Sequence, residues 1–309
     1  MKRKKRKEKR EEKRKDSTLK TQETQETQEE RKERKEKRKD STLKTQEAQE
    51  TQEERKERKE KREKEEREEK VMAGSSGIIG DEVLMEIKRL HSWDLEAAEA
   101  RAVQARLAAE VVEETPAGFQ PRMVAAADIS ADRFSSVLFA AVVVMSFPEM
   151  ETIEVRTVVT EAVFPYVPGL LSFRELPALE KAFGELEEEP DLVLLDGHGR
   201  AHPRRLGLAC HAGLLLGKPA VGVAKSVLVG KYEAPGRDRG CFSPLVDEGE
   251  TVGVALRTRT GVKPVFVSIG HMIDLEAARE IVVACAAGRR LPEPSRAAHE
   301  AANRARRAF

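Results

Sequence analysis

Residues 191–199 read Asp-Leu-Val-Leu-Leu-Asp-Gly-His-Gly, and this stretch decides the fold. Four apolar residues stop abruptly at a carboxylate and two glycines, which predicts a short buried strand that ends at Asp196. Ligands of open α/β sheets bind at the carboxyl ends of strands, so Asp196 is placed for chemistry. For a single Asp, capping of the following helix is the commoner role. Two more carboxylates upstream, Asp128 and Glu175, favour chemistry here.

Charge is distributed unevenly along the 309 residues. Of the 56 basic and 55 acidic residues, residues 1–70 hold 29 and 22, a net charge of +7, and the remainder has a net charge of −6. A mildly acidic body argues against a protein that binds nucleic acid by charge alone, because such a protein needs a dominant basic face. The acidic surplus instead fits a cluster of metal-binding carboxylates.

Cysteine spacing and apolar runs exclude other classes of protein. Cys210, Cys241 and Cys285 lie far apart, which predicts neither a disulfide framework nor a zinc site and indicates a reducing compartment. The longest apolar run, residues 137–145, is shorter than the about 20 residues that a membrane-spanning helix needs. The basic N-terminus lacks the apolar segment of a signal peptide. We therefore expect a soluble, cytoplasmic monomer without membrane contact.

Residues 1–71 form a charged, low-complexity tail in which Lys13–Glu36 recurs as Lys37–Glu60 with one difference. The tail has too few apolar residues to bury a core, and two leucines do not make a coiled-coil seam. It is predicted to be disordered or a solvated single helix. A nucleic-acid tether is the sharper hypothesis, and an idle extension is the one we favour. Residues 72–80 predict a flexible linker before a folded domain at 81–309.

The elements predicted after the linker indicate an α/β fold. A helix is expected from Asp94 to about Glu114. Three closely spaced segments then have strand character and predict an antiparallel meander: 123–129, 135–147 and 152–160. Helices at 172–187 and 204–216 are then predicted to alternate with strands at 192–195 and 220–224. This alternation implies that the two strands are parallel neighbours in the sheet. The chain closes with a hairpin and two helices, predicted at 252–257 with 265–268, at 275–287 and within 289–309.

Three antiparallel strands, a helix and then parallel strands form the order of a ribonuclease H-like mixed sheet flanked by helices. The carboxylates fall on its first strand (Asp128), on the helix after the meander (Glu175) and at the end of the fourth strand (Asp196). Magnesium prefers oxygen ligands, and clustered carboxylates repel one another without a cation. Two ions about 3.5–4 Å apart would activate water and stabilise the leaving oxygen of a phosphodiester. The pattern therefore predicts a Mg²⁺ site, in which Mn²⁺ is expected to substitute.

Six motifs, in order from about residue 88 to the C-terminus, resemble the endonuclease V family. They read LHSWDL (90–95), FPYVPGLLSFRE (164–175), DGHGRAHPR (196–204), GVAKS (222–226), VSIGH (267–271) and RLPEPSRAAH (290–299). The resemblance does not cover the tail. It implies a magnesium-dependent endonuclease that recognises deoxyinosine in DNA, the deamination product of adenine. Such an enzyme cuts the second phosphodiester bond on the 3′ side and leaves 3′-hydroxyl and 5′-phosphate ends.

The resemblance also implies roles for single residues. Asp128, Glu175 and Asp196 would hold the metal. His299 would position the metal's water shell or the scissile phosphate, and Lys225 would neutralise a phosphate or the developing charge.

The same resemblance implies a wedge and a base pocket. Tyr166, between Pro165 and Pro168, would fill the gap left by the extruded base. The hypoxanthine pocket would be shaped by Gly169, Leu170, the Gly197–Gly199 loop and His202. Two departures from the family pattern stand out, at Ala126-Ala127-Asp128-Ile129 on the first strand and at His198, where Gln is usual. The acids are intact, so cleavage is expected, while pocket fit and the choice between DNA and RNA are open.

The other histidines and the single tryptophan have plainer interpretations. His91 and His211 are expected to be surface or packing residues, Trp93 to anchor the N-terminal helix in the core, and His271 to hydrogen-bond a loop. His198 is equally open to a substrate or metal contact and to a structural role. Three functions remain after the sequence is read: an endonuclease for inosine in DNA, one acting mainly on inosine-containing RNA, and a non-catalytic nucleic-acid-binding protein. Intact acids at all three positions argue against the last of these.

Overall fold

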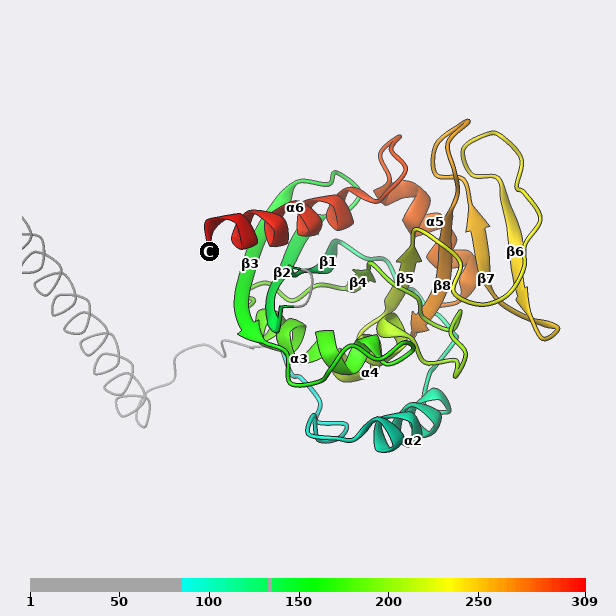
Figure 1. Ribbon diagram of the computed structural model, residues 1–309. Helices are drawn as coiled ribbons and strands as arrows, with labels where there is room; N and C mark the ends of the chain where they lie inside the picture. The colour runs from blue at the N-terminus through cyan, green and yellow to red at the C-terminus, as the bar shows by residue number, and fades with distance from the viewer. Residues whose placement is uncertain (1–84, 133–134) are drawn as a thin grey trace, which may run out of the picture. The chain divides into compact units, whose positions relative to one another are not determined.

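The computed structural model describes residues 85–132 and 135–309 (Figure 1). The charged tail, the linker and residues 81–84 of the predicted domain lie outside the described residues.

One eight-stranded mixed sheet organises the described chain, in the order β3-β2-β1-β4-β5-β8-β7-β6. Its first five strands are β1 (Met123–Ser130), β2 (Val137–Ser146), β3 (Thr152–Glu161), β4 (Leu192–Leu195) and β5 (Ala220–Ala224). β1, β2 and β3 pair antiparallel, and β1, β4 and β5 pair parallel. The predicted meander followed by parallel strands is therefore confirmed.

The other half of the sheet is antiparallel and consists of β6 (Phe242–Asp247), β7 (Glu250–Leu256) and β8 (Val265–His271). The predicted hairpin is confirmed as β7 and β8, with Val254 beside Val267, and β8 joins the parallel half through β5. β6 was not predicted from the sequence. Pro244 lies within it, and a proline is tolerated there because β6 is an edge strand.

Two helices cover each face of the sheet, as Figure 1 shows. α3 (Leu171–Gly184) and α4 (Leu208–Leu216) pack on one face, and α5 (Leu275–Cys285) and α6 (Glu293–Ala308) pack on the other. Side chains alternate along a strand, so Ala125 of β1 faces α3 and α4 while its neighbour Ala126 faces α5 and α6. Burial on both faces explains why the parallel strands read as continuous apolar runs.

α2 (Ala97–Ala108) lies outside α3 and α4. Its Leu107 packs on Leu206, Cys210 and Leu214, in and just before α4. The helix is shorter than predicted. It begins after Glu96, whose capping box with Glu99 satisfies the first turn, and it ends at Ala108 instead of Glu114.

α4 also begins later than predicted, at Leu208 instead of Arg204, because residues 197–207 form a loop. Gly199 approaches β8 so closely that a Cβ atom there would lie 1.9 Å from the carbonyl oxygen of Ile269. The backbone of the loop is therefore packed directly against the sheet, and the site described below is built on that loop.

β3 alternates between exposed and half-buried residues, and its β-branched face is turned to solvent. Ile153, Val155 and Val159 are each nearly half exposed. Within residues 85–132 and 135–309, no helix is long and apolar enough to cross a membrane.

Candidate functional site

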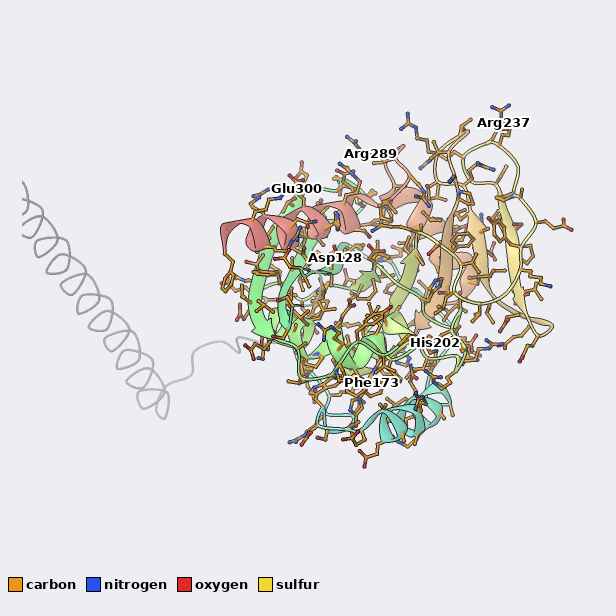
Figure 2. All side chains as sticks on the ribbon, viewed as in Figure 1. Asp128, Phe173, His202, Arg237, Arg289 and Glu300 are labelled. Atoms are coloured by element: carbon orange, nitrogen blue, oxygen red, sulfur yellow. The ribbon has the colours of Figure 1, made fainter. Side chains whose placement is uncertain are left out.

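β1 and β4 bring two of the predicted acids to one edge of the sheet, and Figure 2 labels the first of them, Asp128. In the parallel ladder Ala127 is the partner of Leu195, so Asp128 and Asp196 follow side by side. Burial raises the pKa of Asp128, and the negative charge of Asp196 raises it further, against the hydrogen bond from His299. The two carboxylates therefore lie within strong electrostatic reach of each other.

Glu175, the third predicted acid, comes from the N-terminal part of α3. Burial raises the pKa of Glu175 to about 8, and the charges of Asp128 and Asp196 contribute to the same shift, while Arg174 opposes it. The three acids therefore come from β1, α3 and the end of β4, and the charges of Asp128 and Asp196 act on Glu175.

His299 reaches Asp128 from α6. Its Nδ1 lies 2.6 Å from Asp128 Oδ2, and its Nε2 lies 3.1 Å from the side-chain amide nitrogen of Asn303. A carboxylate only accepts hydrogen bonds, so Nδ1 carries the proton and Nε2 accepts from Asn303. Ser130 Oγ donates to Asn303 Oδ1 at 2.9 Å, which fixes the orientation of that amide. This network sets the tautomer of His299.

Lys225 follows β5, and its Nζ donates to Asp196 Oδ2. The backbone at Lys225 is held by Arg290, whose Nη2 donates to Lys225 O at 2.9 Å and to Pro264 O at 3.1 Å. Nε of the same guanidinium donates to Lys263 O at 3.2 Å. Arg290 therefore ties the loop after β5 to the segment that leads into β8.

In the described part of the chain, no three His, Cys, Asp or Glu side chains stand ready to hold a metal ion. Asp196 is bonded to Lys225, and Asp128 to His299, so both acids already have partners. The metal assignment stays a prediction. The donor set nevertheless fits a divalent cation, because it consists of carboxylate oxygens, and burial together with the charges of Asp128 and Asp196 raises the pKa of Glu175.

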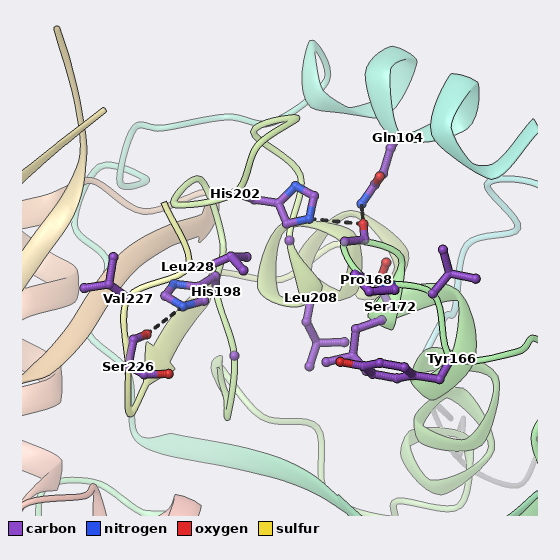
Figure 3. A pocket seen from close by; sticks show the side chains of 15 residues that line it. Gln104, Tyr166, Pro168, Ser172, His198, His202, Leu208, Ser226, Val227 and Leu228 are labelled. Carbon is purple, nitrogen blue, oxygen red and sulfur yellow. Dashed lines mark hydrogen bonds between the residues drawn. The ribbon is translucent and has the colours of Figure 1, made fainter. Parts of the chain in front are cut away.

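A pocket of about 210 Å³ begins next to the acids, at Gly197 (Figure 3). Four residues predicted for substrate binding line it: Tyr166, Gly169, Gly197 and His202. Tyr166 is 69% exposed, which suits a wedge better than a core residue. The two remaining predicted residues are not in the lining, since Leu170 is fully buried against Phe173 and Pro165 is exposed outside it.

The carbonyl oxygen of Gly169 is held by three donors. Gln104 Nε2 donates to it at 3.0 Å, His202 Nε2 at 3.1 Å and Arg204 Nη2 at 2.7 Å. Gly169 has a φ of +78°, a backbone conformation that disfavours other residues. Figure 3 shows the Gln104 and His202 contacts converging on this oxygen. The clamp fixes the loop that carries Tyr166.

His202 lines the pocket with both ring nitrogens engaged. Nε2 donates to Gly169 O, so Nδ1 is the acceptor for the backbone N–H of Arg204, at 3.2 Å. Burial and the charge of Arg204 lower the pKa of His202 to about 4, so the ring is neutral near pH 7. It therefore shapes the wall of the pocket and positions the Gly169 loop.

Removing the Gln104 amide tests this clamp. Gln104 is 1% exposed and also donates to Leu206 O at 2.8 Å, so Gln104→Leu leaves buried carbonyl groups short of a donor. We expect the free energy of unfolding to fall by about 1–3 kcal/mol, measured by urea denaturation. Gln120→Leu, at an exposed position, is the matched control. Equal stability of the two variants would contradict the clamp.

The remaining histidines follow their plainer interpretations. His211 is fully buried, with its Nε2 2.7 Å from Nε2 of His91 and its Nδ1 3.0 Å from Ser172 Oγ. His271 accepts a hydrogen bond from the backbone N–H of Val112, at 3.2 Å, so the expected loop contact is confirmed. His198 lines the pocket, where its Nε2 donates to Ser226 O at 3.0 Å.

Trp93 packs beside the helices as expected, and its Nε1 donates to Glu180 at 2.7 Å.

Sequence reasoning missed three residues of the site: Gln104, Arg290 and Asn303. A signal existed for Gln104, which shares a helical face with Ala100 and Leu107 and is therefore a lone amide on an apolar face. Asn303 is four residues after His299 on a helix, the spacing at which side chains meet.

This sheet order, with Asp128 and Asp196 at the ends of β1 and β4, Glu175 on α3 and a pocket beside them, defines a nuclease of the ribonuclease H-like fold. Comparisons with known proteins agree. A family model described as Endonuclease V matches residues 105–300. The endonuclease V of Dehalococcoides mccartyi is 49% identical over 220 residues, which are 71% of this chain and 97% of that protein.

Solved structures give the same result. Endonuclease V from Streptomyces avermitilis matches with a TM-score of 0.67 at 43% identity, over 70% of this chain and 96% of that one. Human endonuclease V matches with a TM-score of 0.63 at 34% identity, over 69% and 99%. Ciona intestinalis endonuclease V, in complex with a DNA containing an inosine followed by a ribo-adenosine, matches with a TM-score of 0.60 at 26% identity, over 68% and 98%. The chain belongs to the endonuclease V family.

Proposed function

We propose that this nuclease recognises deoxyinosine in DNA and hydrolyses the second phosphodiester bond on its 3′ side, for repair of deaminated adenine. One observation carries the proposal: a pocket lined by Tyr166 and Gly197 begins one residue from Asp196. A strand whose flipped base occupied that pocket would pass directly over the three acids. The Ciona intestinalis relative in complex with inosine-containing DNA supports the same substrate.

Base recognition would depend on Tyr166 and on the rigid walls of the pocket. A nuclease that reads a base inside a duplex must extrude it, and extrusion leaves a gap in the stack. The exposed ring of Tyr166 is available to fill that gap. The clamp on Gly169 holds the loop of Tyr166 in place before substrate arrives, so little ordering is needed on binding.

Asp128, Glu175 and Asp196 would hold Mg²⁺, with Mn²⁺ as a substitute. A bound divalent ion supplies activation of water and stabilisation of the leaving oxygen. The rest of the chemistry comes from the protein. Lys225 holds its ammonium group against Asp196, where it would neutralise a charged phosphate. His299, with its proton fixed on Nδ1, would orient water or phosphate near Asp128.

The direct test is cleavage of matched single strands with Mg²⁺, one carrying deoxyinosine and one carrying adenine. We expect cutting only of the inosine strand, at the second bond on the 3′ side, with 3′-hydroxyl and 5′-phosphate products. Equal cutting of both strands would refute inosine recognition.

Inosine-containing RNA is the second candidate substrate. The observation that favours it is the ribo-adenosine that follows inosine in the strand bound by the Ciona intestinalis relative. Contacts to the 2′-hydroxyl distinguish RNA from DNA at a given site. Strands that differ only by ribose or deoxyribose after the inosine decide between the two substrates, through their kcat/KM ratio.

The charged tail yields a separate prediction. Its net charge of +7 would make it a tether, yet Glu is interleaved throughout. Each neutralised phosphate adds to the salt dependence of binding. We expect the protein that starts at Met72 to show the same slope of log Kd against log salt as the full chain. A flatter slope for the shorter protein would establish the tether.

A further inference from the structure

A second hollow lies on the other side of Asp196 from the base pocket. It has a volume of about 480 Å³, and its charged lining residues are Asp196, Lys225, Arg259, Arg289, Arg290, Arg296 and Glu300. The hollow and the base pocket share no lining residue, and the Asp196–Gly197 peptide separates them. Figure 2 shows Arg289 and Glu300 on the side of the molecule formed by α6 and the segment before it. Five basic side chains against two acidic ones make this hollow suitable for an anion.

Ser295 gives the hollow an unsatisfied polar atom. The residue is 8% exposed and lines the hollow, and its Oγ has no hydrogen-bond partner in the described part of the chain. A buried hydroxyl without a partner is costly, so its presence beside a basic hollow points to a ligand that accepts its hydrogen bond.

The position of Ser295 in its helix also favours an anionic ligand. It lies in the first turn of α6, which begins at Glu293. The first N–H groups of a helix have no partner within the helix, and the positive end of the helix dipole lies there. Pro294 has no N–H, and the N–H of Arg296 donates to Pro292 O at 3.0 Å. The hydroxyl and backbone N–H of Ser295 and the helix dipole therefore lie at one end of the hollow, an arrangement that suits phosphate.

The arginines of the hollow differ in how far they are already engaged. The guanidinium of Arg290 already donates hydrogen bonds to carbonyl oxygens, as described above. Arg296 donates to both oxygens of Glu293 at 2.7 Å, and Arg289 lies 3.6 Å from the same carboxylate. Arg259 is exposed, and its side chain makes no hydrogen bond or ion pair to another described residue. Arg259 is therefore the cation that is free to meet an incoming anion.

We propose that this hollow is a phosphate subsite of the bound strand, in which Ser295 and Arg259 hold a backbone phosphate on the 3′ side of the scissile bond. The direction rests on the proposed function. With the base in its pocket and the cut on its 3′ side, a strand that crosses the acids continues into the hollow.

Single neutral methylphosphonate linkages test the proposal. They are introduced one at a time at each of the first three positions on the 3′ side of the scissile bond in an inosine strand, and binding is measured with the full-length protein in Ca²⁺. For the wild-type protein we expect one of these positions to weaken binding by about tenfold, the worth of one charge-assisted hydrogen bond. For Ser295→Ala and Arg259→Ala, the charged strand should bind about tenfold more weakly, and neutralising that same position should cost nothing more.

Two controls separate this contact from general effects. Ser295→Thr retains the hydroxyl and should restore the wild-type response. Arg307→Ala removes an equal charge at an exposed position of α6 outside the hollow and should leave the response to methylphosphonate intact. Thermal unfolding confirms that each variant is folded.

The proposal is overturned if each neutralised position weakens strand binding by the wild-type protein and by the two variants by the same factor. It is also overturned if no neutralised position weakens binding by the wild-type protein. The proposed function fails in a different way, when the wild-type protein does not distinguish the inosine strand from the adenine strand.

Discussion

Asp196→Asn is expected to give a folded protein that binds inosine-containing strands and scarcely cuts them. The change preserves volume and replaces an anionic oxygen with an amide. It removes one of the three carboxylates proposed to hold Mg²⁺ and the partner of Lys225. Because a correctly held ion contributes several kcal/mol of charge stabilisation, we expect the cleavage rate in Mg²⁺ to fall by about a thousandfold or more. Tyr166 and the pocket are untouched, so affinity for the inosine strand should persist.

The measurement is single-turnover cleavage together with equilibrium binding of the same strand. Asp238→Asn, at an exposed position away from the site, is the matched control. Asp128→Asn and Glu175→Gln should behave like Asp196→Asn, and double variants should lose little more, because residues that act as one unit are not additive. Cutting by Asp196→Asn at nearly the wild-type rate would refute the assignment of the acids.

Tyr166→Ala should weaken binding and cleavage of an inosine duplex by up to about a hundredfold, since stacking on a base is worth about 1–3 kcal/mol. The loss should be smaller on a single strand, where less unstacking is required. Tyr166→Phe retains the ring and should remain close to the wild-type protein on both substrates.

Comparing kcat/KM for duplex and single strand separates a wedge from a merely structural tyrosine. The ring is exposed, so truncation should leave the free energy of unfolding nearly unchanged. If the alanine variant lost equal activity on both substrates, or none on either, the wedge assignment would be wrong.

The local sequence pattern was sufficient to predict features that depend only on neighbouring residues. An apolar run that stops at Asp196 can hardly be other than a buried strand with a carboxylate at its end, and the parallel ladder then places Asp128 beside it. The strand depends on its local apolar pattern, which a sequence records directly. The wedge at Tyr166 was implied by the family resemblance, and the ring is 69% exposed.

Tertiary packing determined the contacts between residues that lie far apart in the chain. Gln104 holds Gly169 and Leu206, which follow it by 65 and 102 residues, and only the placement of α2 across α3 and α4 brings them within reach. The late start of α4 has a similar cause, because Gly207 just before it is extended and packs so closely on the His198 loop that a Cβ atom there would lie 2.2 Å from the carbonyl oxygen of His198.

The hollow at Ser295 also depends on tertiary packing. Nothing in its own motif distinguishes an unsatisfied hydroxyl from a solvated one, and the difference arises only when α6 lies across the sheet and buries it. The sequence by itself indicated which side chains are candidates for the chemistry. The folded chain decided which of their polar atoms are already paired and which are left for a substrate, because hydrogen-bond partners are a property of three-dimensional neighbours.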